Sequence, residues 1–172
     1  MNTKQYQILS FLIVFTLLFG GSAIWFQNNY RIMVNTYFDL SSSSWGERYY
    51  LTTTSPPESL YRGLAIVFET TVTHGLYKQD QKIIKKIAAL PGDRITAEGD
   101  KFYINGQLTA ERPILANIRK LEIPQFAEDF DIVIPDGHFA VLGENLDVSF
   151  DSRYYGSVPE SQILYEVVTP FG

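Results

Sequence analysis

The hydrophobic and polar positions divide the chain into an apolar amino-terminal run and a long series of short, strand-like segments. The run from Ile8 to Phe26 spans 19 residues without a charge. At about 1.5 Å per residue, a helix of that length nearly crosses a hydrocarbon core of ~30 Å. From Glu47 onward, short apolar and β-branched segments are separated by Gly, Pro, Asn and Asp. This pattern is typical of strands joined by turns.

The second part of the chain is therefore predicted to be mostly β, as one compact antiparallel domain. Glu98-Gly99-Asp100 is a hairpin signal, and Pro135-Asp136-Gly137 predicts another turn. Residues 108–126 follow no clear pattern. The expected strands are Arg48–Thr53, Leu64–Thr71, Lys82–Ala89, Arg94–Ala97, Lys101–Ile104, Phe130–Ile134, His138–Leu142 and Ile163–Val168.

These patterns predict one transmembrane helix in front of the β domain. Two other interpretations of the apolar run stay open. Gly21-Ser22-Ala23 places small residues where a signal peptide would be cut, and a buried core helix would also be apolar. The bulky residues that follow Ala23 favour a retained anchor. We divide the chain into a cytoplasmic amino terminus (1–7), the anchor (8–26), a Ser-rich connector (27–46) and the β domain (47–172).

Composition removes several classes of function. The net charge is -5 and no basic run is present, so nucleic acid is not an expected partner. The chain has no cysteine, which excludes disulfides, thiolate metal sites and cysteine nucleophiles. Its two histidines have no metal-ligand spacing, and we expect neither a metal nor another cofactor.

Lys85 is the candidate general base. In a strand over Lys82–Ala89, side chains alternate between two faces, and the face that carries Lys85 is otherwise apolar. Burial among apolar groups lowers the pKa of a lysine, and a lysine accepts a proton only when it is neutral. On the strand pattern alone, an edge lysine that keeps its head group in water is the more ordinary interpretation.

Ser55 is the candidate nucleophile. It follows a predicted strand and precedes Pro56 and Pro57, which fix the backbone in an extended exit. A hydroxyl just before such a bend is held in one direction. Thr54 and Ser59 are rival hydroxyls on spacing alone, and a simple polar turn would show the same residues.

Two blocks of the sequence resemble the Ser/Lys signal peptidase family, and within it the TraF-type peptidases of conjugative transfer. In that family a strand ends in Lys, a basic residue, apolar residues and then Leu-Pro-Gly-Asp, and Lys85 to Asp93 matches this order. A later family block reads Gly-Asp-Asn, three residues, Ser, one residue and Asp-Ser-Arg. Gly143 to Arg153 reproduces it, with Glu144 in place of Asp. The resemblance covers roughly residues 50–165 together with the apolar run.

The segment around the serine resembles the TraF subtype. General signal peptidases have a proline three places after the serine, whereas TraF-type enzymes have it two places after, followed by a glycine and a tyrosine. Ser55, Pro57 and Tyr61 fit the TraF spacing, and Ser59 stands where that family has glycine. The other register would make Thr54 the nucleophile.

The resemblance implies a role for each matching residue. Ser55 would be the nucleophile and Lys85 the general base. Thr53 would support the oxyanion, and Ser149 would orient the lysine amine. Asp151 and Arg153 would form a structural ion pair that braces this loop.

The resemblance also implies a fold and a function. The fold would be the antiparallel β domain of signal peptidases. The protein would be a serine endopeptidase of the bacterial inner membrane, single-pass, with its catalytic domain in the periplasm. Its substrates would be exported precursors, above all the pilin of a conjugative transfer system, matured by hydrolysis or by cyclisation. The bilayer and other conjugation or secretion components would be its partners.

Two alternatives come from other classes of protein. A non-catalytic pilus or secretion assembly protein could keep the peptidase fold, and the departures at Pro56, Ser59, Leu64 and Glu144 would agree with it. A self-cleaving repressor relative shares Ser/Lys chemistry. The apolar run and the missing DNA-binding domain oppose that second alternative.

Overall fold

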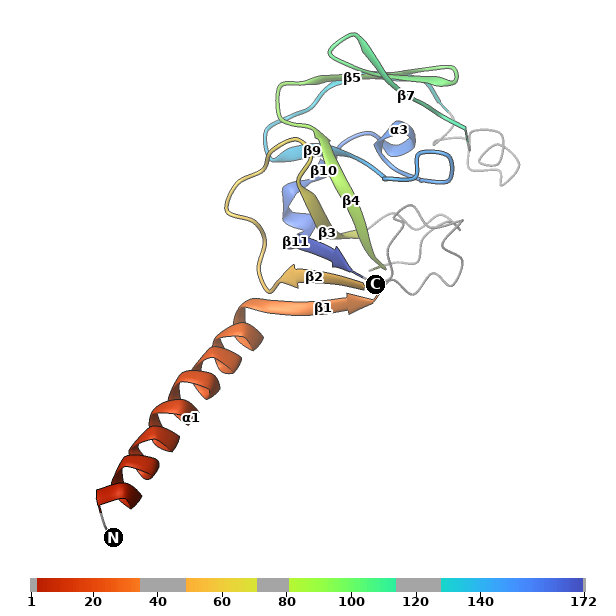
Figure 1. Cartoon of the computed structure of the whole chain (residues 1–172). Helices are drawn as coiled ribbons and strands as arrows, with labels where there is room; N and C mark the ends of the chain where they lie inside the picture. Colours follow the sequence, from red (N-terminus) through yellow and green to blue (C-terminus); the bar gives the residue numbers. More distant parts are fainter. Residues whose placement is uncertain (1–2, 35–48, 71–80, 114–127, 172) are drawn as a thin grey trace.

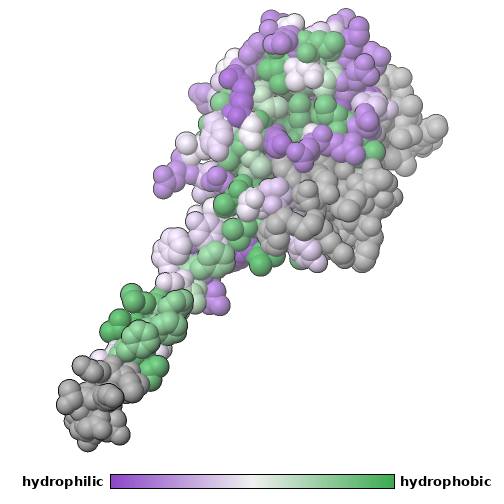
Figure 2. Space-filling view, in the orientation of Figure 1, coloured by the Kyte–Doolittle hydropathy of each residue, from purple (hydrophilic) through white to green (hydrophobic). Residues whose placement is uncertain are grey.

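The structure is a computed structural model of the chain, and it describes residues 3–34, 49–70, 81–113 and 128–171. A single long helix, α1 (Thr3–Asn29), projects away from a β domain (Figure 1). By length and composition, α1 could cross a membrane over Ser10–Asn29, and none of that segment is buried in the protein. On the face that Figure 2 shows, apolar side chains cover much of the coloured part of the helix, and polar ones rim the β domain. The apolar segment of the helix does not pack into a core, which does not agree with a buried core helix.

The described strands form two antiparallel sheets. The larger has seven strands in the order β1-β2-β11-β3-β4-β9-β10, and the smaller has four in the order β7-β6-β5-β8. Strands of the larger sheet are β1 (Tyr30–Val34), β2 (Tyr49–Thr53), β3 (Ala65–Thr70), β4 (Gln81–Ala89), β9 (His138–Leu142), β10 (Val158–Pro159) and β11 (Ile163–Phe171). Strands of the smaller sheet are β5 (Arg94–Glu98), β6 (Lys101–Ile104), β7 (Gln107–Glu111) and β8 (Phe130–Val133). Two short helices, α3 (Ser152–Tyr155) and the 3-10 helix η2 (Glu160–Gln162), lie in the segment between β9 and β11.

The larger sheet buries one face of β3 and β4 against β9. Ile66 and Phe68 on β3 pack with Ile83 and Ile87 on β4 in a buried cluster that also contains Phe139. Burial alternates along β4 from Ile83 to Ala89, as the period of two in the sequence predicts. This alternation places Lys85 on the buried face, between two isoleucines that anchor the strand.

The smaller sheet is joined to the larger one through its own core and through Arg112. Ile95 and Phe102 pack with Ala89 and Ala140 from the larger sheet. The buried side chain of Arg112 donates hydrogen bonds to the carbonyls of Gly99 and Glu128 and forms an ion pair with Asp129.

The predicted strands are found with small shifts at their ends. Within the predicted connector, Tyr30–Val34 forms a strand that pairs with β2 directly after the helix, and the sequence pattern did not predict this strand. The remaining part of the connector, including its serines, lies outside the described residues, as do residues 114–126 of the stretch without a clear pattern. Strands β7 and β10 and helix α3 were not predicted.

Candidate active site

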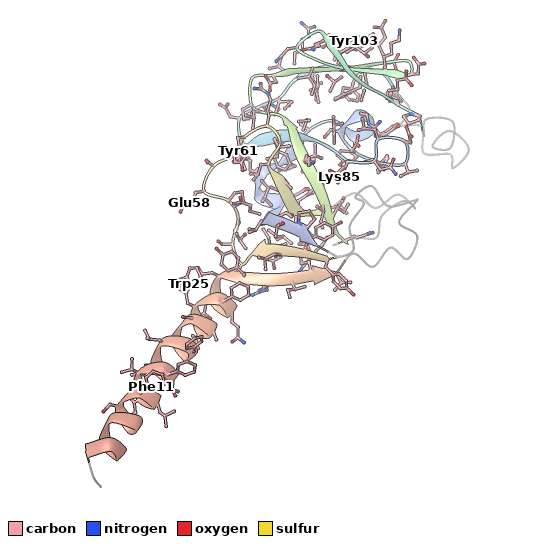
Figure 3. The ribbon with its side chains drawn as sticks, viewed as in Figure 1. Phe11, Trp25, Glu58, Tyr61, Lys85 and Tyr103 are labelled. Carbon is pink, nitrogen blue, oxygen red and sulfur yellow. The ribbon has the colours of Figure 1, made fainter. Side chains whose placement is uncertain are left out.

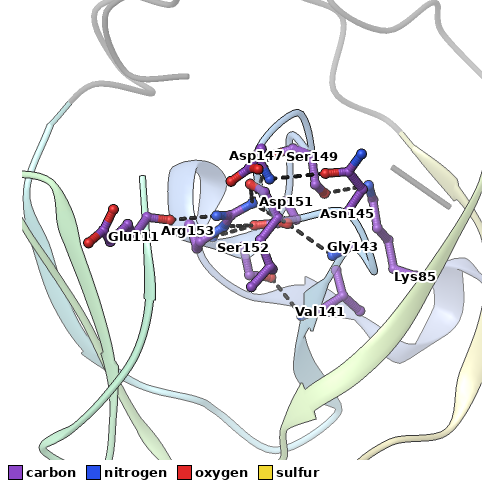
Figure 4. Close-up of polar contacts among 11 residues, drawn as sticks. Lys85, Glu111, Val141, Gly143, Asn145, Asp147, Ser149, Asp151, Ser152 and Arg153 are labelled. Carbon is purple, nitrogen blue, oxygen red and sulfur yellow. Dashed lines mark hydrogen bonds and ion pairs between the residues drawn. The ribbon is translucent and has the colours of Figure 1, made fainter. Parts of the chain in front are cut away.

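Lys85 lies in the middle of β4 with no exposed surface. Its amine donates a 2.8 Å hydrogen bond to the hydroxyl of Ser149, which is equally buried (Figure 4). Desolvation by burial lowers the pKa of Lys85 to about 8, against the opposing effect of the Asp151 carboxylate and with a further lowering by the Arg153 guanidinium. A substantial fraction of this amine is therefore neutral near pH 8, so it can accept a proton.

The loop that carries Ser149 is held by a buried ion pair. Asp151 and Arg153 have no exposed side-chain surface, and their closest oxygen and nitrogen are 2.8 Å apart. Asp151 also accepts hydrogen bonds from the backbone N–H groups of Gly143 and Arg153. It caps helix α3, where Ser152 accepts a hydrogen bond from the N–H of Val141. The carboxylate therefore satisfies three donors in the turn that delivers Ser149 to Lys85 (Figure 4).

Arg153 extends this network to the second sheet. Its guanidinium donates to the carbonyls of Leu146 and Ser149 in the loop, and to the carbonyl of Glu111 at the end of β7. The aromatic ring of Tyr154 lies 5.5 Å from the guanidinium carbons of both Arg153 and Arg112. The smaller sheet thus braces the loop that positions the lysine.

Ser55 lies just after β2 and its side chain is exposed. The preceding residue, Thr54, binds the carboxyl-terminal end of α1: its N–H donates to Asn29 O at 3.1 Å and its hydroxyl to Asn28 O at 2.7 Å. The hydroxyl of Thr53 donates to the carbonyl of Ser55 and accepts from the N–H of Glu166. In the described part of the chain Ser55 is thus the one hydroxyl of this Thr53-Thr54-Ser55 segment without a hydrogen bond.

The structure brings Lys85, Ser149, Asp151 and Arg153 together but does not place Ser55 against the amine. No hydrogen bond joins Ser55 to Lys85, although both lie in the described residues. Strand pairing gives the distance between the two regions, because Thr53 lies opposite Glu166, Glu166 opposite Ile66, and Ile66 opposite Lys85. Residues paired in this way point to one face of the sheet. Three strand spacings separate Thr53 from Lys85 along that face, roughly 14 Å at about 4.8 Å each.

Two features near the site were not predicted from the sequence. Glu166 occupies the same face, between the strand that leads to Ser55 and the strand that carries Lys85. Asp93 is buried and accepts hydrogen bonds from both Arg62 and Asn105, as well as from the N–H of Leu90. Burial alone would raise the pKa of Asp93, but these donors, Arg62 foremost, hold it below its usual value.

The Arg62–Asp93 ion pair fixes the end of the loop that carries Ser55. Both Asp93 oxygens lie 2.6 Å from the Arg62 guanidinium, and the N–H of Gly63 donates to Ile87 O at 2.7 Å. Asp93 closes the Leu-Pro-Gly-Asp block, so its position in that block was a sequence signal. Its partner Arg62 has no such signal, because the pairing depends on how β3 and β4 align.

The mostly antiparallel β fold and the contact between the two sequence blocks at Lys85 and Ser149 agree with the class of protein that the sequence resembles, the signal peptidase family. A family model described as "Signal peptidase, peptidase S26" matches residues 6–171, and the chain belongs to this family. It is similar to a probable signal peptidase I-2 of Synechocystis sp., with 33% identity over 60% of this chain, and to signal peptidase IB of Staphylococcus aureus, with 28% identity over 63%. A crystal structure of a signal peptidase I from Enterococcus faecalis V583 is 27% identical, covering 65% of this chain and 98% of that one, with a TM-score of 0.42.

The matched region spans 44% of the length of the Synechocystis protein and 59% of the length of the Staphylococcus protein. Membership of the family and the mostly antiparallel β fold agree with the prediction. The apolar helix together with the family indicates a membrane-anchored protein. The TraF subtype, the catalytic dyad and the substrate stay predictions.

Proposed function

We propose that this protein is a membrane-anchored serine endopeptidase that cleaves exported precursors through an acyl-enzyme on Ser55, with Lys85 as the general base. The observation that carries the proposal is a lysine amine with no exposed surface, held by a 2.8 Å hydrogen bond to Ser149. A structural lysine would gain from solvation or from a direct ion pair. This amine instead has an apolar environment and a hydroxyl partner, which favours the neutral form.

In the proposed mechanism the neutral Lys85 takes the proton of Ser55, and the serine oxygen attacks the scissile carbonyl. A general base must come within about 3 Å of the hydroxyl, and such contacts are often formed only when substrate is bound. Ser55 and the Lys85 amine would therefore come into contact only when substrate is bound. The Ser55 N–H and the Thr53 hydroxyl would then hold the oxyanion, each donor contributing roughly 3–4 kcal/mol.

Ser149 is the one serine in hydrogen-bond contact with Lys85 among the described residues, which makes it a rival nucleophile. Ser149 has no exposed surface, so a substrate carbonyl does not reach its hydroxyl in this arrangement. Ser55 is exposed and its hydroxyl is not engaged. This difference favours Ser55 as the nucleophile and Ser149 as the residue that orients the amine. The engaged hydroxyl of Thr54 disfavours the alternative register.

The contact between Thr54 and the end of α1 supports a membrane substrate. If α1 spans the bilayer, Asn28 and Asn29 lie at the bilayer surface. Thr54 is hydrogen-bonded to both of these residues, and Ser55 is the next residue in the chain. The nucleophile would then lie at the membrane–water boundary, where the apolar segment of an exported precursor emerges. We place this boundary on the periplasmic side of the inner membrane, with the amino terminus in the cytoplasm.

The spacing of Ser55, Pro57 and Tyr61 supports the TraF subtype, and from it we infer that the substrate is the pilin of a conjugative transfer system. The acyl-enzyme would be released by water, or by the amine of the pilin's own terminus to give a ring. Coexpression with a pilin precursor, followed by intact mass measurement of the pilin, tests this. We expect the leader to be removed by the native chain and not by the Ser55→Ala or Lys85→Ala variant. If both variants still processed the precursor, the proposed catalytic roles of Ser55 and Lys85 would be contradicted.

The separation of Ser55 from Lys85 favours a second candidate, a non-catalytic assembly protein with a peptidase fold. Such a protein would bind the precursor and leave its mass unchanged. The same mass measurement therefore separates the two functions.

A further inference from the structure

A cavity lies beside the loop that carries Ser55, outside the Lys85 network. Its volume is about 360 Å³, within the usual range of ligand pockets of roughly 300–1,000 Å³. Its lining comes from the loop itself, the turn between β4 and β5, and the start of β11. The apolar lining residues are Pro56, Pro57, Leu60, Leu90, Pro91 and Ile163.

The cavity is close enough to Ser55 to receive a residue next to the scissile bond. The loop residues that line it begin immediately after Ser55 and continue to Leu60. Three residues of chain reach at most about 10 Å, and an extended substrate advances about 3.3 Å per residue. A side chain within about three residues of the cleaved bond therefore reaches this cavity.

Two carboxylates and the hydroxyl-bearing Ser59 also line the cavity. Glu58 comes from the Ser55 loop and Glu160 from η2, and both are exposed. Figure 3 shows Glu58 on the outer side of the loop. Within the described residues neither carboxylate takes part in an ion pair, whereas the nearby Arg62 is bound to Asp93. The lining of the cavity thus carries two negative charges that no described residue balances in an ion pair.

We infer that this cavity binds a lysine or arginine side chain of the substrate, within about three residues of the cleaved bond. The inference rests on the proposed peptidase function and adds a determinant of its specificity. Long cationic side chains bury an apolar stem and keep the charged head near water. The proline, leucine and isoleucine lining would take the stem, and Glu58 and Glu160 would meet the head group. A substrate aspartate or glutamate at the same position would be repelled by Glu58 and Glu160.

This inference can be tested with a peptide library made by cleaving a proteome on the carboxyl side of glutamate residues. Such peptides are not cut at lysine or arginine, so both residues occur inside them. The full chain in detergent micelles would be incubated with the library, and new termini would be identified by mass spectrometry. We expect lysine and arginine to be enriched at least threefold at one position within three residues of the cut. The double variant Glu58→Gln, Glu160→Gln should lose this enrichment. The single variant Glu160→Lys should turn it toward acidic residues.

Glu98→Gln is the matched control, because Glu98 is an exposed glutamate on β5 that does not line the cavity. This control should keep the native preference. Cleavage without basic enrichment, or equal enrichment in the native chain and the double variant, would overturn the inference and leave the peptidase function standing. Loss of all cleavage in the double variant would also contradict it, because carboxylates that only select would not abolish the reaction. No cleavage by the native chain would overturn both the function and the inference.

Discussion

At the scale of single residues, Lys85 combines a charge-bearing amine with an apolar environment. Desolvation is the largest cause that lowers the pKa of this amine from 10.5 to about 8. Asp151 opposes this change, but it is already bound by Arg153 and by backbone donors. Desolvation therefore dominates, and the amine can serve as a base at moderate pH.

The pH dependence of peptide cleavage follows from this value. A general base must be neutral, and the neutral fraction of Lys85 grows as pH rises through about 8. We expect kcat/KM to rise about tenfold per pH unit below this value and to level off above it. A profile of kcat/KM from pH 5 to 10 measures this. A rising limb centred below pH 6 would mean that a carboxylate or histidine is the base instead.

Replacement of Lys85 by methionine should stabilise the protein at neutral pH. Below pH 8 the lysine is protonated in both the folded and the unfolded state, so the cost of desolvating its charge is fully present. The lowering of its pKa from 10.5 to about 8 corresponds to a cost of roughly 3 kcal/mol. Between about pH 8 and 10.5 the unfolded state binds more protons, so the native protein gains stability as pH rises. We expect Lys85→Met to raise the unfolding midpoint at pH 7, and the difference to shrink at pH 10. Lys86→Met, in an exposed ion pair with Glu144, should show no such pH dependence.

At the scale of elements, the turn between β9 and α3 holds the lysine partner through one buried carboxylate. Removing one member of a buried ion pair leaves the other charge unpaired, at a cost of about 3–5 kcal/mol. We expect Asp151→Ala to destabilise the protein by this amount, because Arg153 and the Gly143 N–H both lose an acceptor. Denaturant unfolding in detergent measures it. Glu144→Ala breaks an exposed pair and should cost at most about 1 kcal/mol, so equal losses would contradict this assignment.

The elements that the sequence predicts well are those whose pattern is local. The strand that carries Lys85 alternates strictly, and its buried face was therefore visible in the sequence. The ion pair of Asp151 and Arg153 joins residues two positions apart, and the family resemblance implied it. Strand β1 escaped prediction because Tyr30–Val34 borders the apolar run and pairs with a strand about twenty residues later. Two other contacts depend on how the strands align, which no local sequence pattern contains. They are the ion pair of Arg62 with Asp93 and the contact of Glu166 with Thr53.

At the scale of the whole molecule, helix α1 and the β domain are directly joined. Helix α1 ends at Asn29, β1 starts at the next residue, and Thr54 binds the last carbonyls of the helix. A helix that continues through Gly21-Ser22-Ala23 and contacts the domain favours a retained anchor over a cleaved signal peptide.

Retention of the anchor predicts the mass of the protein in membranes. The chain of 172 residues has a mass of 19.6 kDa. Intact mass measurement after detergent extraction should return the mass of a chain that still contains residues 8–26. A product that begins after Ala23 would show that the apolar run is a signal peptide.

The central claim is that the exposed Ser55, and not the buried Ser149, attacks the substrate. Because the chain has no cysteine, Ser55→Cys and Ser149→Cys each introduce a single thiol. Peptide cleavage before and after treatment with a maleimide tests the claim most directly. We predict that Ser55→Ala is inactive and that any activity of Ser55→Cys is lost on alkylation, while the native chain is unaffected by the reagent. Cleavage that survives Ser55→Ala, or that alkylation abolishes in Ser149→Cys but not in Ser55→Cys, would contradict it.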